Sequence, residues 1–275
     1  MELPALVSLD VRVTDHVAEV TLLGPGQGNA MGPDLFRELP LVFAAIEADP
    51  RVRAVTLTGS GDNFCYGLDL VAMAPLFNAM LDSPEPVSPR VAFRDELIRL
   101  QEAMTAVARC RVPVIAAISG WCIGGGVDIS AAADIRLASS DAIFSVREAK
   151  MAIVADIGSL QRLVGIIGEG HLRELAFTGK NIDAARAERI GLVNEVYPDR
   201  ASLLDAARAL AAEIAANSPL AVHGTKEMLN AEREQRVTAG LRYVAAWNAA
   251  FLPSHDLAEA LRAFSERRTP NFHGD

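Results

Sequence analysis

The stretch PVIAAISGWCIGGGVDISAAADIRLAS, residues 113–139, decides how this sequence is read. Residues 113–120 form an apolar run rich in Ile and Val, which is typical of a strand covered on both faces. Three glycines at positions 124–126 follow, and residues 127–133 then have the pattern of a short helix before "DIRLAS" returns to a strand pattern. A buried strand, a glycine turn and a helix in this order predict an α/β fold.

Strand and helix patterns also alternate on the N-terminal side of this stretch. Residues 17–24 and 54–62 have strand patterns, and residues 34–48 and 93–109 have amphipathic helix patterns. Residues 81–90 are rich in Pro and Ser, which predicts a surface loop. Strands interleaved with helices agree with an α/β core.

From residue 159 onward the pattern changes to helices with almost no strand signal. An alanine-rich helix is expected over residues 202–217, and helical periods continue to residue 264. We therefore expect an α/β core over residues 1–200 that carries the active site, followed by a C-terminal helical region over residues 201–275. No linker composition separates the two parts, so the helical region should pack on the core or on a neighbouring subunit.

Composition and charge limit the classes of partner. The chain has 275 residues, with 26 basic and 35 acidic side chains and a formal net charge of −9. A net negative surface repels phosphate backbones, so nucleic acid is not expected as a partner. The longest uncharged stretch, residues 112–127, is too short for a membrane span, so no membrane partner is expected. The N-terminus lacks the pattern of a secretory signal, and three cysteines without CxxC spacing predict reduced thiols in a cytoplasmic protein.

Several common catalytic motifs are missing from the sequence. The glycines do not form GxGxxG and do not precede GK[ST], so a phosphate-binding loop is not favoured. The GxSxG turn of many serine hydrolases is also absent. The five histidines lack spacings such as HExxH, and no metal site is expected.

Backbone N–H groups at two places are the first candidate functional groups. A glycine turn that opens a helix leaves N–H groups near Gly125 without helical partners, and such groups stabilise developing negative charge. The segment GDNFCYGLDL, residues 61–70, follows a predicted strand and is expected to open a helix at GLDL, with free N–H groups near Gly67 and Leu68. Two plainer explanations stay open, the glycines as a packing turn and Asp69 as a helix cap. If both places converge on one carbonyl oxygen, they form an oxyanion hole.

Three acids in apolar settings follow: Asp128, Glu148 and Asp156. Asp128 and Asp156 have an ordinary explanation as helix caps. Glu148 has one as the ion-pair partner of Arg147 or Lys150. Three such acids beside a candidate oxyanion hole favour proton transfer instead. Magnesium is a weaker interpretation, because magnesium retains bound waters and the aliphatic neighbours make a dry site.

Residues 113–163 resemble the crotonase (enoyl-CoA hydratase/isomerase) superfamily, and the resemblance runs from about residue 17 to the C-terminus. Within that superfamily the chain is most similar to the dienoyl-CoA isomerases, which convert a 3,5-diene to a 2,4-diene in an acyl-CoA. The segments GGGVD, REA and ADIGSLQRL carry this finer similarity, and AAWNAAFLPSHDLAEALRAF supports it.

The resemblance has implications for fold, assembly and substrate. It implies a spiral of ββα units with a C-terminal helical oligomerisation region, assembled as a homotrimer or as a hexamer made of two trimers. It also implies an acyl-CoA thioester substrate. No separate cofactor is implied, because coenzyme A is part of the substrate.

Carried over by position, the resemblance places two oxyanion N–H groups on Leu68 and Gly125. Neighbours in the same two turns are expected to contact the substrate: Tyr66, Gly67, Asp69 and Gly124. The two acid positions of the hydratases fall on Asp128 and Glu148, and the additional aspartate of the dienoyl isomerases falls on Asp156. Hydratases have glutamate at the first of these positions and usually a small residue at the last. Both departures from the hydratase pattern therefore agree with the isomerase pattern.

The implied reaction is a proton relay in fatty acid β-oxidation. Glu148 would remove a proton from carbon 2 of the thioester and neutral Asp156 would return one at carbon 6, while Asp128 biases the charge state of the pair. One alternative is hydration of a 2-trans-enoyl-CoA, for which Asp128 is one methylene shorter than the usual glutamate. An alternative of another class is a non-catalytic or RNA-binding homologue, against which the acidic composition argues.

Overall fold

A central sheet organises the molecule. The structure is a computed structural model that describes residues 3–26, 28–81, 83, 85 and 87–275. Among these residues, the strand order across the sheet is β1 (Leu9–Thr14), β2 (Val17–Leu22), β3 (Ala54–Gly59), β4 (Val114–Ile118), β6 (Ile135–Ser139) and β9 (Glu195–Tyr197). Strands β1 and β2 form an antiparallel hairpin, and every later neighbouring pair is parallel.

A second, smaller sheet is formed by strands that alternate with those of the first. Its order is β5 (Trp121–Ile123), β7 (Ile143–Ser145) and β8 (Ile182–Asp183). The chain passes from β4 through β5 into helix α4 (Gly125–Ala132), and from β6 through β7 towards helix α5 (Ser159–Thr178). Each of these two turns thus gives one strand to each sheet and then a helix, whereas β1, β2 and β3 all belong to the larger sheet. This arrangement confirms the predicted α/β spiral of ββα units.

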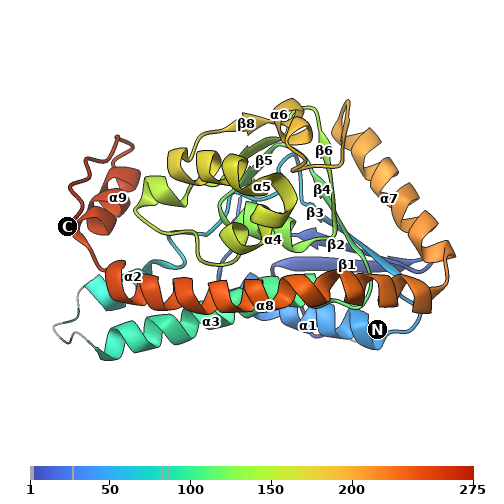
Figure 1. Cartoon of the computed structure of the whole chain (residues 1–275), viewed down its shortest axis with the longest axis horizontal. Helices are drawn as coiled ribbons and strands as arrows, with labels where there is room; N and C mark the ends of the chain where they lie inside the picture. The colour runs from blue at the N-terminus through green and yellow to red at the C-terminus, as the bar shows by residue number, and fades with distance from the viewer. Residues whose placement is uncertain (1–2, 27, 82, 84, 86) are drawn as a thin grey trace.

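Strand β4 is buried on both faces, as its Ile and Val content predicts. Val114, Ala116 and Ile118 belong to the main hydrophobic core, whereas Ile115 and Ala117 pack with helix α7 (Arg200–Ala216). The helix contributes side chains at intervals of four residues: Leu203, Ala207, Ala211 and Ala215. Residues four apart lie on one helix face, and their small size lets α7 lie close to the sheet (Figure 1).

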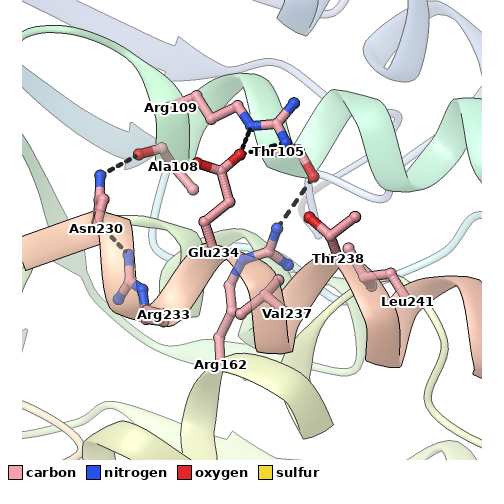
Figure 2. Close-up of a pocket in the computed structure, with 10 residues that line it drawn as sticks. All are labelled: Thr105, Ala108, Arg109, Arg162, Asn230, Arg233, Glu234, Val237, Thr238 and Leu241. Carbon is pink, nitrogen blue, oxygen red and sulfur yellow. Dashed lines mark hydrogen bonds and ion pairs between the residues drawn. The ribbon is translucent and has the colours of Figure 1, made fainter. Parts of the chain in front are cut away.

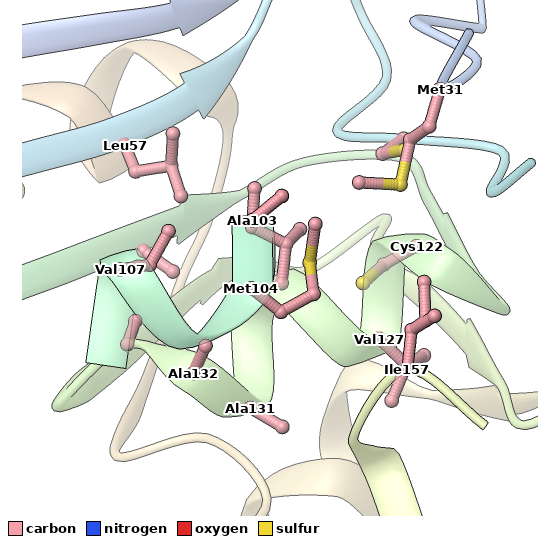
Figure 3. Close-up of a cluster of buried hydrophobic side chains, with 14 of the residues drawn as sticks. Met31, Leu57, Ala103, Met104, Val107, Cys122, Val127, Ala131, Ala132 and Ile157 are labelled. Carbon is pink, nitrogen blue, oxygen red and sulfur yellow. The ribbon is translucent and has the colours of Figure 1, made fainter. Parts of the chain in front are cut away.

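Helices enclose the core on the other face of the sheet. They include α1 (Pro33–Ala48), α3 (Ser88–Arg109) and α4, with the shorter α2 (Ala74–Leu81), α6 (Ala184–Arg189) and the 3-10 helix η1 (Glu148–Met151). Figure 3 shows Met104 of α3 among side chains of β5 and α4, including Cys122 and Val127. All three side chains are buried, so the packing holds α4 firmly behind the glycine turn at which it begins.

The chain ends in helices α8 (Pro219–Phe251) and α9 (His255–Ser265). Helix α8 lies beside α3 along the length of the molecule (Figure 1). Buried Lys226 fastens α8 to the sheet, because its Nζ donates to Val112 O at 3.0 Å and to Asp134 Oδ2 at 2.6 Å. The division into a core over residues 1–200 and a helical region over 201–275 stays a prediction, as does a role of the latter in oligomerisation.

Replacement of Lys226 by Met is expected to lower the free energy of unfolding by about 3 kcal/mol, because it leaves Asp134 without its buried counter-charge. Lys180→Met is the matched control, since Lys180 pairs with Glu174 at the surface, and it should cost about 0–1 kcal/mol. Urea denaturation of both variants measures the difference. Equal losses would show that the buried pair does not anchor α8.

The structure differs from the sequence predictions in several elements. The helix expected at GLDL does not form, because Leu68 makes an isolated β-bridge with Met31 and α2 begins later, at Ala74. The short strands β1, β5, β8 and β9 were not predicted, since a few residues carry too little periodicity. Helix α3 begins at Ser88, inside the segment expected to be a surface loop. Positions 82, 84 and 86 of that segment lie outside the described residues.

Candidate active site

Backbone pairing fixes the loop that carries Leu68. On one side the loop lies along β5, where Ile123 N–H donates to Cys65 O at 2.9 Å. On the other side Met31 N–H donates to Gly67 O at 2.8 Å. The loop after β3 is thus held between two other segments, and Leu68 lies beside the first residue of α4.

The N–H groups of Leu68 and Gly125 are neighbours. A Cβ atom built on Gly125 would lie 3.6 Å from the Leu68 nitrogen. Within the described part of the chain neither N–H donates a hydrogen bond. The Gly125 N–H is free because it opens α4, at the positive end of the helix dipole. The Leu68 N–H is free in a loop and not at a helix start, which corrects the reason given by the sequence. Two adjacent free donors can both donate to one oxygen atom.

Glycine is required at two of the positions expected to contact a substrate. Gly67 has a φ of +86°, and a Cβ there would lie 2.7 Å from Ile123 O. Gly124 has a φ of +51°, and a Cβ there would lie 3.3 Å from Glu148 Oε1. Any side chain at these positions would be strained and would displace the donor loop or the nearby carboxylate.

Asn29 supports the same loop and was missed by the sequence analysis. Its side chain is buried, and Nδ2 donates to Ser60 O at 2.8 Å and to Asn63 O at 2.7 Å. Its φ is +47°, a conformation that asparagine tolerates better than most residues. Its partners are 31 and 34 positions away, so nothing local in the sequence distinguishes it from an ordinary turn residue.

Asp128 is buried on α4, and only one of its two carboxylate oxygens accepts a hydrogen bond from the described residues. Its residue is 1% exposed, its Oδ1 accepts from Ser159 N–H, and its buried Oδ2 has no partner among the described residues. Burial raises the pKa of Asp128 to about 6, although the Ser159 N–H and the Arg162 charge oppose that rise. Asp128 Oδ1 therefore caps the start of helix α5 and not that of its own helix, while Oδ2 stays without a hydrogen-bond partner in the described part of the chain.

Glu148 begins η1 and lies beside the glycine turn. Its Oε2 is buried and has no partner in the described part of the chain. Burial raises the pKa of Glu148 to about 8, and the charge of Asp128 adds to the rise. Arg147, one of its two expected ion-pair partners, donates instead to Asn181. The ordinary explanation of Glu148 as half of that ion pair is therefore not what the structure contains.

Asp156 lies in the segment that leads into α5 and is held by two amides. Asn248 Nδ2 donates to its Oδ2 at 2.5 Å, and Gln101 Nε2 donates to its backbone carbonyl at 2.7 Å. Burial raises the pKa of Asp156 to about 7, against the opposing effect of the Asn248 hydrogen bond. Neither amide is recognisable from the sequence around Asp156, because Asn248 comes from α8 and Gln101 from α3.

The charges of the three acids act on one another. The charge of Asp128 raises the pKa of both other acids, and that of Asp156 raises the pKa of Glu148. The values of about 6 for Asp128, about 7 for Asp156 and about 8 for Glu148 bracket neutral pH, so the cluster holds both proton and negative charge there.

A buried cation lies behind this cluster. Arg162 on α5 is 2% exposed and donates to Thr105 Oγ1 at 3.1 Å and to Ile157 O at 3.3 Å. Figure 2 shows its side chain passing between α8 and α3 to reach Thr105. Its charge lowers the pKa of Asp128. Arg162 thus favours the ionised form of Asp128. A proton bound by the three acids near neutral pH is therefore shared between Glu148 and Asp156.

The other predicted contact residues have structural partners of their own. Tyr66 is 46% exposed and meets Trp121 edge to face, with ring centroids 6.4 Å apart. Asp69 Oδ1 accepts from Val71 N–H at 3.1 Å and from Ala72 N–H at 3.0 Å, so it caps the turn that follows. Substrate contacts of Tyr66 and Asp69 stay predictions.

Within the residues that the structure describes, no three His, Cys, Asp or Glu side chains come together as metal ligands. No helix in that part of the chain combines the length and apolar character needed to cross a membrane. The three free cysteines are all buried.

The family model for enoyl-CoA hydratase/isomerase matches residues 12–275. The chain belongs to this family. A solved enoyl-CoA hydratase from Mycobacterium avium subsp. paratuberculosis has a similar fold, with a TM-score of 0.82 and 26% sequence identity. That match covers 98% of this chain and 100% of the other. The expected crotonase-type fold is thereby confirmed.

Sequence relatives within the family are more similar. A mitochondrial Δ(3,5)-Δ(2,4)-dienoyl-CoA isomerase from Dictyostelium discoideum is 46% identical, over 96% of this chain and 90% of that protein. A peroxisomal enzyme of the same name from Arabidopsis thaliana is 41% identical, over 90% of this chain and 89% of that protein. The expected similarity to dienoyl-CoA isomerases is confirmed.

The cytoplasmic location expected from the sequence is contradicted by these relatives, which are mitochondrial and peroxisomal proteins. The expectation used the lack of a secretory pattern and the number of cysteines. Those features separate secreted proteins from other proteins, but they do not separate the cytoplasm from an organelle.

Proposed function

We propose that this protein isomerises 3,5-dienoyl-CoA to 2,4-dienoyl-CoA in fatty acid β-oxidation. The observation that carries the proposal is the pair of free N–H groups on Leu68 and Gly125 next to two carboxyl groups, of Asp128 and Glu148, that each have one buried oxygen without a partner among the described residues. Relatives that are 41% and 46% identical and named as dienoyl-CoA isomerases support it. The coenzyme A needed is part of the substrate.

The first step forms an enolate at the thioester. The thioester oxygen accepts from the Leu68 and Gly125 N–H groups, and each such donor contributes about 10²–10³ in rate. Carbon 2 is two bonds from that oxygen, and Glu148 Oε1 lies 3.3 Å from the Cβ position of Gly124, the residue before the Gly125 donor, so Glu148 is the acid that we assign to remove its proton. Ionised Glu148 is the base of this step.

The second step returns a proton at the far end of the diene. Conjugation carries the negative charge from carbon 2 to carbon 6, where neutral Asp156 donates its proton. Glu148 gains a proton and Asp156 loses one, so the pair holds one proton before and after the reaction. Burial raises the pKa of Glu148 to about 8 and that of Asp156 to about 7, so near neutral pH the pair can hold the single proton that this relay needs.

Ultraviolet assays of the purified protein with two substrates test this function. With a 3,5-dienoyl-CoA, the absorbance of the conjugated 2,4-dienoyl thioester should grow. With a 2-trans-enoyl-CoA, the loss of enoyl absorbance should be slow, because Asp128 is short and its Oδ1 already accepts from Ser159 N–H. Rapid hydration without isomerisation would make the protein a hydratase, and silence with both substrates would refute the proposal.

The rate of isomerisation should have a bell-shaped dependence on pH. Below about pH 7 a second proton binds the Glu148–Asp156 pair and no base is left, and above about pH 8 the last proton leaves and no acid is left. Measurement of kcat/KM between pH 5 and pH 10 gives both limbs. A rate that rises with pH to a plateau would mean that one ionised acid is sufficient.

The proposed assembly is a homotrimer or a hexamer of two trimers. Large apolar side chains exposed on α8 support a packing surface there: Leu220, Met228, Leu229 and Phe251.

A further inference from the structure

Helix α8 reaches the candidate active site through one buried side chain. Asn248 is 1% exposed, and its Nδ2 donates to Asp156 Oδ2 at 2.5 Å and to Val154 O at 2.9 Å. These two acceptors use both hydrogens of the amide nitrogen. Asn248 therefore holds the side chain of Asp156 and the backbone two residues before it at the same time.

The contact with Val154 determines which way the amide points. A backbone carbonyl only accepts hydrogen bonds, so the group of Asn248 that faces Val154 O must be the NH2 and not the oxygen. The same NH2 faces Asp156, so Asp156 Oδ2 must be an acceptor. When Asp156 is neutral, its proton is therefore on the other oxygen, Oδ1.

Gln101 secures the same segment at a second point. Its Nε2 donates to Asp156 O at 2.7 Å and to Leu241 O at 3.0 Å. Leu241 lies two helical turns before Asn248 on α8, so both contacts come from one face of that helix. The segment is thus held between α3 and α8, which limits rotation of the Asp156 carboxyl group.

We propose that Asn248 is a positioning residue that presents Asp156 to the substrate with its proton on Oδ1. The inference rests on the proposed function, because it gives an orientation to the acid that delivers the proton at carbon 6. Asn248 does not touch the substrate through its NH2, whose hydrogens are both engaged. Helix α8 thereby completes the active site in addition to packing on α3.

The charged groups around Asp156 set the direction of the pH effect. Asp128 on α4 faces it and raises its pKa, Glu148 on η1 is affected by its charge, and Arg162 on α5 acts through Asp128. The Asn248 hydrogen bond opposes the rise. Loss of that bond raises the pKa of Asp156, so the bell-shaped pH–rate profile should move to higher pH.

Asn248→Leu removes the donors and keeps most of the volume. Isomerisation should fall by about 10–100-fold, as expected when a reacting group is misplaced by about 1 Å. The bell should move upward by on the order of one pH unit. Deuterium exchange at carbon 2, which needs Glu148 and the two N–H groups, should stay within about threefold of wild type.

Two further variants make the test specific. Asn230→Leu, on the same helix, removes a contact to Ala108 O at 3.3 Å (Figure 2) and should change neither the profile nor the ratio of isomerisation to exchange. Asn248→Asp keeps the size of the side chain but cannot donate to both acceptors, and its added charge should move the bell at least as far upward.

The outcomes separate this inference from the proposed function. If wild-type protein does not isomerise the diene, the proposed function fails before any variant is compared. If wild type isomerises but both Asn248 variants keep its pH profile, or lose exchange and isomerisation together, Asn248 has a structural role and the inference is overturned.

Discussion

Asp156→Asn is expected to abolish isomerisation of a 3,5-dienoyl-CoA while proton exchange at carbon 2 of the same substrate continues. The amide has the size of the carboxyl group but no acidic proton to deliver, so kcat/KM should fall by about 10²–10⁴. Exchange depends on Glu148 and on the N–H groups of Leu68 and Gly125, which the substitution leaves in place. Product is followed by ultraviolet absorbance, and exchange by deuterium uptake from D2O measured by mass spectrometry.

Asp199→Asn is the matched control for this substitution. Asp199 caps α7 by accepting from Ser202 N–H at 2.8 Å, and asparagine caps a helix about as well. Isomerisation and carbon 2 exchange should therefore both continue at the wild-type rate in the control. Isomerisation at the wild-type rate in Asp156→Asn would exclude Asp156 as the proton donor. Loss of exchange together with isomerisation would show that the two acids do not divide the reaction between them.

Features encoded by a few consecutive residues were predictable from the sequence. The Ile/Val run of β4 predicts burial on both faces, and the structure places alternate residues in two different cores. The glycine turn predicts a helix start with free N–H groups, and α4 begins at Gly125. In each case the signal and the structure it determines lie within one element.

Features that depend on partners far along the chain were not predictable in the same way. Leu68 lies where it does because its loop pairs with β5 and with Met31, and no periodicity in GLDL reports those partners. A helix was expected there, since GLDL has the local pattern of a helix start. The Leu68 N–H is free as expected, but it is free in a paired loop and not at a helix start, and its role as an oxyanion donor stays a prediction.

The charge state of the site shows the same limit. Apolar neighbours in the sequence predict that the acids are buried, but not which of them keeps the proton. That balance depends on the buried Arg162, which favours ionised Asp128, and on Asn248, which lies 92 positions from Asp156. A sequence contains these residues without revealing that they meet.

Gly67→Ala is expected to reduce isomerisation and carbon 2 exchange together, by about 10²–10³. Its Cβ would lie 2.7 Å from Ile123 O, a backbone atom, so the loop must move and the Leu68 N–H leaves its place beside Gly125. Both reactions pass through the same enolate, so both lose the same donor. Initial rates of the ultraviolet and deuterium assays, at saturating substrate, measure the two losses.

Gly61→Ala controls for backbone strain, because Gly61 has a φ of +65° and nothing lies within 4 Å of its Cβ position. Both substitutions force alanine into a left-handed conformation, which costs about 1 kcal/mol. The resulting decrease in the free energy of unfolding should therefore be common to both variants. Only Gly67→Ala should lose activity. If it retains both reactions within about tenfold, the Leu68 N–H is not an oxyanion donor. A loss of isomerisation without loss of exchange would assign the loop to proton delivery at carbon 6, the role that Asp156→Asn tests independently.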